Sequence, residues 1–302
     1  TQVHLNNSGA EAVEAAMKFA RKFTGKKGMV AMKGSYHGKS FGALSLTFNP
    51  KYRKAFAPLV EKVSFASFGD MDSLRSVIDD DTAFIILEPI QGESGIIVAP
   101  DGFLQEVRKL CNEKGILLIF DEIQAGLGRT GRLWAGEHWN TSPDILCLAK
   151  GIAGGVPMGA TLVRPDILAA ISKGEHSSTF GGNPISCAAG IAALKSITED
   201  GLVENSKKMG DMFREGLEKL KEKHMMIREI RGKGLMIGIE MKFEVKDILM
   251  GLIEEGVLML YSGRNILRIL PPLVINEEDV TKVLHALDIV IGREEQKRNV
   301  QR

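Results

Sequence analysis

Ionisable side chains close three of the apolar runs in this chain. Lys150 comes after DILCLA, and Glu88 closes TAFIILE. Asp121 and Glu122 close GILLIFDE. In open α/β sheets, ligands collect at the carboxyl ends of the strands. A carboxylate at a strand end can also simply cap the next turn, but three such ends on one rim favour a shared site.

Lys150 stands directly before the glycine-rich turn of LAKGIAGGVPMG, residues 148–159. A lysine at that point either turns outward to water or is held in a site that uses its amine. As a nucleophile, the amine can form a Schiff base with a carbonyl substrate or with pyridoxal phosphate. Pyridoxal phosphate requires an anion cradle, an anionic partner for its pyridinium nitrogen and a flat group against its ring.

A candidate anion cradle lies in NNSGAEAVEAAMKFARKFTG, near the start of the chain. Ser8 and Glu11 form the S-x-x-E capping pattern, and Gly9 permits close backbone approach. Free N–H groups at such a helix start hold phosphates in many proteins. The same pattern is also that of a common helix N-cap.

The other two requirements also have candidates. Asp121 is the candidate partner of the ring nitrogen, because its charge would keep that nitrogen protonated and preserve the electron sink. Tyr36, in KGSYHGKS, is the candidate stacking residue, with His37 beside it. A tyrosine–histidine pair is equally consistent with simple packing.

Length, charge and cysteine content narrow the classes of function. With 302 residues, 44% of them hydrophobic, the chain can bury a large core, and we expect two lobes. The 39 basic and 38 acidic residues are scattered and give a net charge of +1. This balance favours a small-molecule partner over nucleic acid or an anionic membrane. Three cysteines fit a reducing cytoplasm rather than a disulfide framework.

Patterns for a membrane span or a leader peptide bear on where the protein is located. No apolar run approaches the ~18 residues of a membrane span, and no basic-then-apolar leader opens the chain. We therefore expect a cytoplasmic protein without membrane contact, and no metal site. The start, TQVHLNNSG, has the pattern of a strand that runs into a helix without a starting methionine, so we expect a preceding segment to be missing.

Apolar runs of strand length alternate with helical patterns over residues 1–195, which predicts an α/β domain with a mostly parallel sheet. The expected strands, each buried on both faces, are 28–32, 62–67, 82–89, 115–122, 144–150 and 159–164. A smaller α+β domain is expected over residues 196–302. It has a long charged helix, strand patterns in REIRGKGLMIGIEM and NILRILPPLVI, and a last helix from Asn276.

The stretch GLGRTG, residues 126–131, matches the dinucleotide-binding pattern G-x-G-x-x-G. The match begins several residues beyond the preceding strand, however. The next strand closes on Lys150, where a ribose-binding acidic residue would be expected. A nicotinamide oxidoreductase is therefore the weaker alternative.

Seven ordered blocks carry a family resemblance that covers nearly the whole chain: SGAEAVEAAMKFAR, YHGKSFGALSLT, EPIQGESG, LLIFDEIQAGLGRTG, PDILCLAKGIAGGVPMGA, STFGGNP and LRILPPLVI. They resemble the class III pyridoxal-phosphate aminotransferases of the ornithine and acetylornithine type. The resemblance implies a fold-type I enzyme and a homodimer with active sites at the subunit interface. Such enzymes usually carry several dozen residues ahead of the SGAEA block, which this sequence does not include.

Residue by residue, the resemblance implies that Lys150 is the Schiff-base lysine and, with Asp121, the catalytic pair. Gln124 resembles the partner of the phenolic oxygen, and Thr179 the threonine that reaches the phosphate of the neighbouring subunit. With the candidates above, the expected cofactor-binding residues are Ser8, Gly9, Ala10, Tyr36, His37, Glu88, Asp121, Gln124, Lys150 and Thr179.

Four residues are expected on the substrate side: Lys39, Glu93, Ser178 and Arg268. Lys39 occupies a position where the family commonly has an arginine that binds the substrate carboxylate. Lysine keeps the charge but loses the bidentate fork, so carboxylate orientation should be looser. Glu93 and Arg268 match a pair in which the glutamate covers the arginine in one half-reaction and uncovers it in the other. A structural salt bridge between the domains is the alternative.

The resemblance implies ping-pong transfer of an amino group from an amine donor to 2-oxoglutarate. Lys150 would serve as the proton-moving base, helped by a buried setting near cations that keeps its amine partly neutral. The favoured donor is the terminal amine of an N-blocked ornithine or lysine in arginine or lysine biosynthesis, with a small amino-group carrier protein as a further expected partner. Open alternatives are a 4-aminobutyrate or ornithine aminotransferase, an amino-acid racemase, and a non-catalytic binding protein of this fold.

Overall fold

The large sheet of the protein supports one rim of ionisable side chains. The structure is a computed structural model that describes residues 1–299. The strands run in the order β1-β9-β8-β7-β4-β2-β3, and β9 alone runs against the other six. Their bounds are β1 Gln2–Asn6, β2 Gly28–Met32, β3 Val63–Ala66, β4 Thr82–Leu87, β7 Leu117–Asp121, β8 Ile145–Leu148 and β9 Gly159–Val163. The predicted mostly parallel sheet is confirmed.

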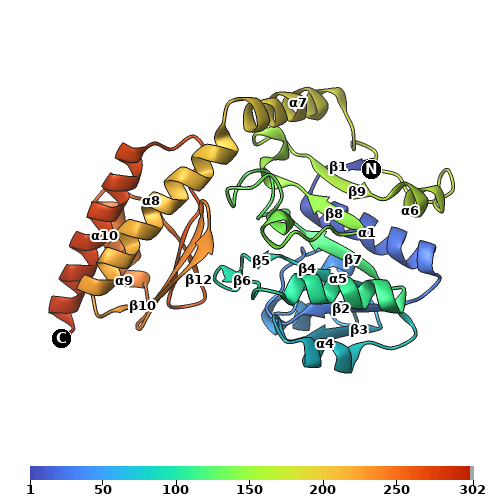
Figure 1. Ribbon diagram of the computed structural model, residues 1–302, viewed down its shortest axis with the longest axis horizontal. Helices are drawn as coiled ribbons and strands as arrows, with labels where there is room; N and C mark the ends of the chain where they lie inside the picture. Colours follow the sequence, from blue (N-terminus) through green and yellow to red (C-terminus); the bar gives the residue numbers. More distant parts are fainter. Residues whose placement is uncertain (300–302) are drawn as a thin grey trace.

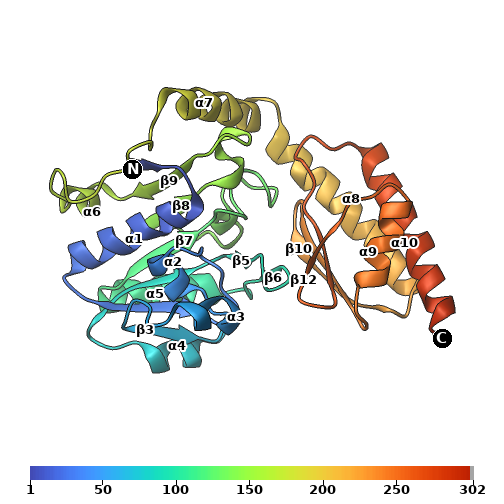
Figure 2. The ribbon, with the colours of Figure 1, turned by 180° about the vertical axis from the view of Figure 1, so that it is seen from behind.

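Helices cover both faces of this sheet, with α1 (Gly9–Thr24) and α2 (Phe41–Leu46) opposite α4 (Met71–Val77) and α5 (Phe103–Lys114) (Figures 1 and 2). Alternate residues of the central strand β4 divide between the two apolar clusters. Ile85 and Leu87 pack in the cluster of α5, whereas Phe84 and Ile86 pack in that of α1. Successive strand side chains point to opposite faces, so a fully apolar run suits a strand covered on both.

The strand β3 departs from the sequence expectation. It forms the edge of the sheet, and Val63, Ser64 and Phe65 are only partly buried. Burial on both faces, expected for residues 62–67, is therefore wrong for this strand. An edge strand has a neighbour on one side only, which a run of apolar letters does not reveal.

Short elements connect the main ones. They are α3 (Pro50–Arg53), β5 (Ile90–Gln91), β6 (Ile97–Val98), α6 (Pro165–Ala169), α7 (Pro184–Glu199) and the 3₁₀ turns Lys54–Phe56, Ala135–Trp139 and Lys150–Ala153. The β5–β6 hairpin reaches toward the second lobe and contacts its strand β10 (Figures 1 and 2).

A smaller lobe follows, with its own antiparallel sheet in the order β10-β11-β13-β12. Its elements are α8 (Leu202–Lys223), β10 (Ile227–Lys233), β11 (Met236–Met241), α9 (Lys246–Glu254), β12 (Leu260–Ser262), β13 (Ile266–Ile269) and α10 (Glu277–Lys297). Asn276 caps α10, as its sequence pattern predicts. A separate apolar cluster between Met209 and Ile291 fills this lobe. Residue 195 lies within α7, and a division of the chain there stays a prediction.

Parallel pairing of β4, β7 and β8 brings their carboxyl ends to one rim. Glu88 directly follows β4, Asp121 is the last residue of β7, and Lys150 stands two residues after β8. Among residues 1–299, no helix has both the length and the apolar content to cross a membrane.

Candidate active site

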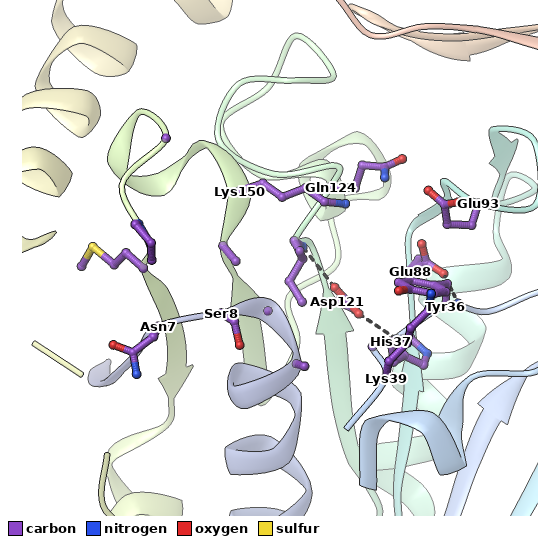
Figure 3. Close-up of a pocket in the computed structure, with 18 of the residues that line it drawn as sticks. Asn7, Ser8, Tyr36, His37, Lys39, Glu88, Glu93, Asp121, Gln124 and Lys150 are labelled. Atoms are coloured by element: carbon purple, nitrogen blue, oxygen red, sulfur yellow. Dashed lines mark hydrogen bonds and ion pairs between the residues drawn. The ribbon is translucent and has the colours of Figure 1, made fainter. Parts of the chain in front are cut away.

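A cavity of about 390 Å³ opens at this rim (Figure 3). The sequence-predicted residues that line it are Ser8, Gly9, Ala10, Tyr36, His37, Lys39, Glu88, Glu93, Asp121, Gln124 and Lys150. The structure thus brings together residues from five separated segments of the chain. Ser178, Thr179 and Arg268 do not line this cavity.

The start of α1 forms one wall of the cavity. The Ser8 hydroxyl caps the helix by accepting from the Glu11 N–H at 3.3 Å. The Glu11 carboxylate accepts from the N–H of Asn7 at 2.9 Å, so the capping box reaches one residue further back than the pattern predicts. The N–H groups of Gly9 and Ala10 lie in the first helical turn, where helix geometry provides no internal partner. This end can hold an anion.

Glycine is required at position 9 because α1 approaches Ile123 closely. A Cβ at Gly9 would lie 2.8 Å from the Cδ1 atom of Ile123. Ile123 lines the cavity between Asp121 and Gln124 and supplies an apolar wall. Sequence reasoning missed Ile123, although its place inside the DEIQ block was an available signal.

Asp121 is held by two hydrogen bonds at the floor of the cavity. Its Oδ2 lies 2.7 Å from Nδ1 of His37, and its Oδ1 accepts from the N–H of Ile123 at 3.1 Å. Both side chains are buried. Within residues 1–299, the Nε2 atom of His37 is buried without a hydrogen-bond partner. His37 therefore contacts the carboxylate of Asp121. Its position beside Tyr36 in the sequence did not indicate this contact.

Glu88 binds two loops rather than pointing freely at a ligand. One carboxylate oxygen accepts from the N–H of Tyr36 at 3.0 Å, and the other from the N–H of Gly92 at 3.1 Å. Burial, opposed by His37 and reinforced by the charge of Asp121, raises the pKa of Glu88 to about 7. Glu88 thus positions the backbone of Tyr36, and its expected place at the cofactor stays a prediction.

Tyr36 and Lys39 lie at the outer side of the cavity. The ring of Tyr36 packs edge-on against Tyr52, with centroids 5.9 Å apart. Burial raises the pKa of the Tyr36 hydroxyl, and so do the nearby Glu93 and Tyr52. The Nζ atom of exposed Lys39 lies 4.8 Å from the centroid of the Tyr52 ring. The lysine cation is therefore loosely held at the cavity mouth.

The side chain of Lys150 extends into the cavity (Figure 3). Its backbone has φ of 46°, a left-handed conformation that is strained for a residue with a Cβ. The side chain lines the open cavity and is accessible to solvent there. Protein atoms still surround the cavity, and this desolvation lowers the pKa of the amine despite the opposing charges of Asp121, Glu88 and Glu93. Within the described chain, the amine has no hydrogen-bond partner.

Glu93 and Arg268 form an ion pair, with Oε1 and Nη1 2.8 Å apart. Burial tends to raise the pKa of Glu93, but the hydrogen bond and charge of Arg268 outweigh it and hold the pKa below its usual value. The small lobe also holds the Glu93 loop through the hydroxyl of Ser262, which donates to the Glu93 carbonyl. The pair lies between the lobes. This place is consistent with a glutamate that covers and uncovers the arginine, and also with a structural salt bridge between the domains.

Besides Arg268, two predicted residues do not line the cavity. Ser178 contacts its edge indirectly, since its hydroxyl accepts from the Nδ2 group of Asn7 at 3.0 Å. Thr179 is exposed on the segment before α7. Its expected contact with the phosphate of the neighbouring subunit involves a second chain and stays a prediction. Sequence reasoning also missed the lining residues Asn7, Val156 and Met158, which lie inside the quoted NNSG and GGVPM stretches.

These residues fit pyridoxal phosphate. The helix start suits a phosphate, Asp121 suits a protonated ring nitrogen, and Tyr36 and Ile123 offer flat and apolar surfaces. Within residues 1–299, the Oε1 atom of Gln124 is buried without a partner, although it lines the cavity. An unpaired buried oxygen is costly unless a ligand satisfies it.

Comparisons with known proteins agree with this chemistry. An acetylornithine aminotransferase of Caldanaerobacter subterraneus is 45% identical over 298 residues, which cover 96% of this chain and 76% of that protein. A [LysW]-aminoadipate semialdehyde/glutamate semialdehyde transaminase of Sulfolobus acidocaldarius is 45% identical over 283 residues, covering 94% and 73%. The solved ornithine aminotransferase of Toxoplasma gondii, with pyridoxal phosphate at partial occupancy in its active site, has a TM-score of 0.95 at 34% identity. That match covers 99% of this chain and 74% of the solved one.

The profile of the aminotransferase class-III family matches residues 1–291, nearly the whole chain. The chain therefore belongs to the class III aminotransferases, which use pyridoxal phosphate.

Proposed function

We propose that this enzyme transfers the terminal amine of an N-blocked ornithine or lysine to 2-oxoglutarate. The observation that carries the proposal is the convergence of Lys150, Asp121 and the start of α1 on one cavity. The names of the acetylornithine and LysW-linked relatives support this donor class and a place in arginine or lysine biosynthesis. The similarity to a solved ornithine aminotransferase keeps free ornithine as the second candidate donor.

When bound, pyridoxal phosphate supplies a carbonyl for the donor amine and an electron-withdrawing ring that stabilises negative charge at the reacting carbon. The N–H groups of Gly9 and Ala10 would bind its phosphate. Asp121, oriented by His37, would keep the ring nitrogen protonated. Tyr36 and Ile123 would restrict the ring from its sides.

Lys150 has two tasks in this proposal: it binds the cofactor through its Nζ atom and moves protons at the reacting carbon. Both tasks need a neutral amine for part of the time. Desolvation around the cavity lowers the pKa of Lys150, which increases the neutral fraction near pH 7. Exposure to the cavity leaves the amine accessible to substrate.

Glu93 and Arg268 would adapt the pocket to two dissimilar substrates. A terminal amine donor brings no carboxylate next to the reacting carbon, so an uncovered Arg268 would be left unpaired. In the ion-paired arrangement, Glu93 neutralises the arginine. A 2-oxo acid would compete with Glu93 for Arg268, and Lys39 would face the carboxylate of the donor.

A homodimer is the expected assembly, and the surface around α7 supports it. Phe180, Ile185, Ile191 and Leu194 are exposed there, and exposed apolar groups of this size favour a protein partner. Thr179 lies on the same surface, consistent with its expected reach into the neighbouring subunit. A small amino-group carrier protein as donor, and a cytoplasmic location, stay predictions from the sequence and the relatives' names.

A donor panel tests this function. The pure protein is mixed with 2-oxoglutarate and, in turn, N-acetylornithine, ornithine, N-blocked lysine, lysine and 4-aminobutyrate, while glutamate formation is measured. We expect the N-blocked donors to give the highest kcat/KM. A higher value for free ornithine or 4-aminobutyrate would contradict the proposed donor, and no transfer with any amine would contradict the reaction.

A further inference from the structure

The Glu93 loop, residues 92–95, connects β5 and β6 of the large lobe, but the small lobe holds Glu93 at two points. Ser262, the last residue of β12, donates through its hydroxyl to the carbonyl of Glu93. Arg268, on β13, contacts the Glu93 carboxylate through Nη1 at 2.8 Å. The strands β12 and β13 are neighbours in one sheet. The same sheet therefore holds both the backbone and the side chain of Glu93.

The rest of the Glu93 loop is fitted between the two lobes. Arg231, on β10, donates through Nε to the carbonyl of Gly95 at 2.9 Å. Gly95 has φ of 101°, and a Cβ there would collide with the Cδ1 atom of Ile266 on β13. From the large lobe, Glu88 accepts from the N–H of Gly92 at 3.1 Å. The backbone position of the loop thus depends on contacts from both lobes.

The ion pair of Glu93 and Arg268 is by itself a modest contact. Within residues 1–299, the Nε atom of Arg268 is buried without a hydrogen-bond partner, so the pair relies on Nη1. The side chain of Glu93 is 38% exposed, which lets water screen the attraction. Such a pair contributes about as much as one buried neutral hydrogen bond. Ser262 is only 6% exposed, and its hydroxyl makes a bond of that kind.

We propose that Ser262 is a positioning residue that keeps Glu93 on Arg268 by fixing the Glu93 carbonyl. While that carbonyl is held, the carboxylate can leave Arg268 only by rotation about its own side-chain bonds. Without the hydroxyl, the loop can also move away from the small lobe and carry the carboxylate with it. Ser262 thereby sets the preference of the site between terminal amines and dicarboxylic acids. The inference rests on the proposed exchange at Arg268, but it can be tested by binding without any reaction.

The probe is glutarate, a dicarboxylate without an oxo group, titrated into the pyridoxal-phosphate-loaded protein by isothermal titration calorimetry. Ser262→Ala should bind glutarate about threefold to tenfold more tightly than the unmodified protein, the range that one hydrogen bond represents. Glu93→Ala removes the competing carboxylate outright and should tighten glutarate binding at least as much. The direction is diagnostic, because loss of a serine that only supports the fold would weaken binding.

The double variant, Ser262→Ala with Glu93→Ala, tests whether Ser262 acts through Glu93. We expect it to bind glutarate as tightly as Glu93→Ala alone, since the position of a carboxylate that is absent no longer matters. Ser206→Ala is the matched control. Ser206 is also buried, and its hydroxyl donates across the lobes to a carbonyl, that of Arg129, at 3.0 Å. Its loss removes an equivalent bond outside the Glu93 loop and should leave the affinity for glutarate unchanged.

Steady-state kinetics provide a second measurement. With glutamate as the donor, Ser262→Ala should lower KM about threefold or more and leave kcat nearly unchanged, so the preference for N-acetylornithine over glutamate should fall. Ser206→Ala should keep that preference.

The outcomes separate this inference from the proposed function. No gain in glutarate affinity in Glu93→Ala would contradict the exchange at Arg268, and the role of Ser262 with it. A gain in Glu93→Ala without one in Ser262→Ala would overturn the role of Ser262 alone. The same holds for a gain from Ser262→Ala that persists in the Glu93→Ala background, or for an equal gain in Ser206→Ala.

Discussion

The Nδ1 atom of His37 lies 2.7 Å from the Oδ2 atom of Asp121, and both side chains are buried beneath the cavity. The pair links the turn after β2 to the end of β7. Since the other oxygen of Asp121 accepts only from the N–H of Ile123 within the described residues, His37 largely fixes how this carboxylate faces the cavity.

His37→Leu should lower kcat about tenfold to a hundredfold, because a hydrogen bond to a charged group is lost. His37→Asn should recover much of this loss, since its amide nitrogen can occupy the place of Nδ1. The affinity for pyridoxal phosphate, measured by equilibrium titration of the cofactor-free protein, should follow the same order. Equal losses in both variants would mean that His37 only fills space.

Lys150→Ala should abolish transamination and the covalent attachment of the cofactor. In the unmodified protein, borohydride reduction should fix pyridoxal phosphate to the peptide that contains Lys150, as read by mass spectrometry. Lys39, which also lines the cavity, is the internal comparison and should stay unlabelled. A label on any lysine other than Lys150 would overturn its assignment.

Asp121→Asn should keep the fold and the attachment to Lys150 but remove the charge next to the ring nitrogen. We expect kcat to fall by several orders of magnitude, on the order of 4 kcal/mol or more in activation free energy if electrostatics dominate. Circular dichroism checks the fold, and steady-state kinetics measure the loss. Near-normal turnover would refute this role.

Glu93→Ala should free Arg268 and improve the use of glutamate as a donor relative to terminal amines. Arg268→Ala should damage mainly the half-reaction with 2-oxoglutarate, because that substrate loses its partner. Stopped-flow absorbance of each half-reaction separates the two effects. Equal losses in both half-reactions for both variants would leave only a structural ion pair.

Glu122 should make the stability of the protein depend on pH. Its buried carboxylate accepts from the N–H groups of Ala135 and Gly136, and burial raises its pKa to about 7 from 4.5. The folded state therefore binds this proton more tightly than the unfolded chain does. The stabilising contribution is complete below pH 4.5 and is lost as the pH rises through 7.

Glu122→Gln should accordingly reduce the fall in Tm between pH 5 and pH 8, measured by calorimetry. Asp101→Asn, which changes an exposed carboxylate that does not act on Glu122, is the control and should leave that fall unchanged. An unchanged slope in Glu122→Gln would show that the carboxylate is ionised throughout this range.

Local pattern was sufficient for the architecture. Alternating apolar and helical segments predicted the parallel sheet, because such a sheet buries β4, β7 and β8 on both faces and makes their sequences continuously apolar. The same rule placed Glu88, Asp121 and Lys150 on one rim, since parallel neighbours end on the same side. The resemblance then supplied roles for these residues, which stay proposals.

Only the tertiary structure decided how the side chains are used. Glu88 binds two backbone N–H groups, His37 contacts Asp121, and Lys150 faces an open cavity. The sequence could not distinguish these uses, because a charged residue after a strand looks the same whether it meets a ligand or a neighbouring loop. Continuous apolar runs predict strands that are buried on both faces, whereas strand direction and hydrogen-bond partners depend on how distant segments pack, as the antiparallel β9 shows.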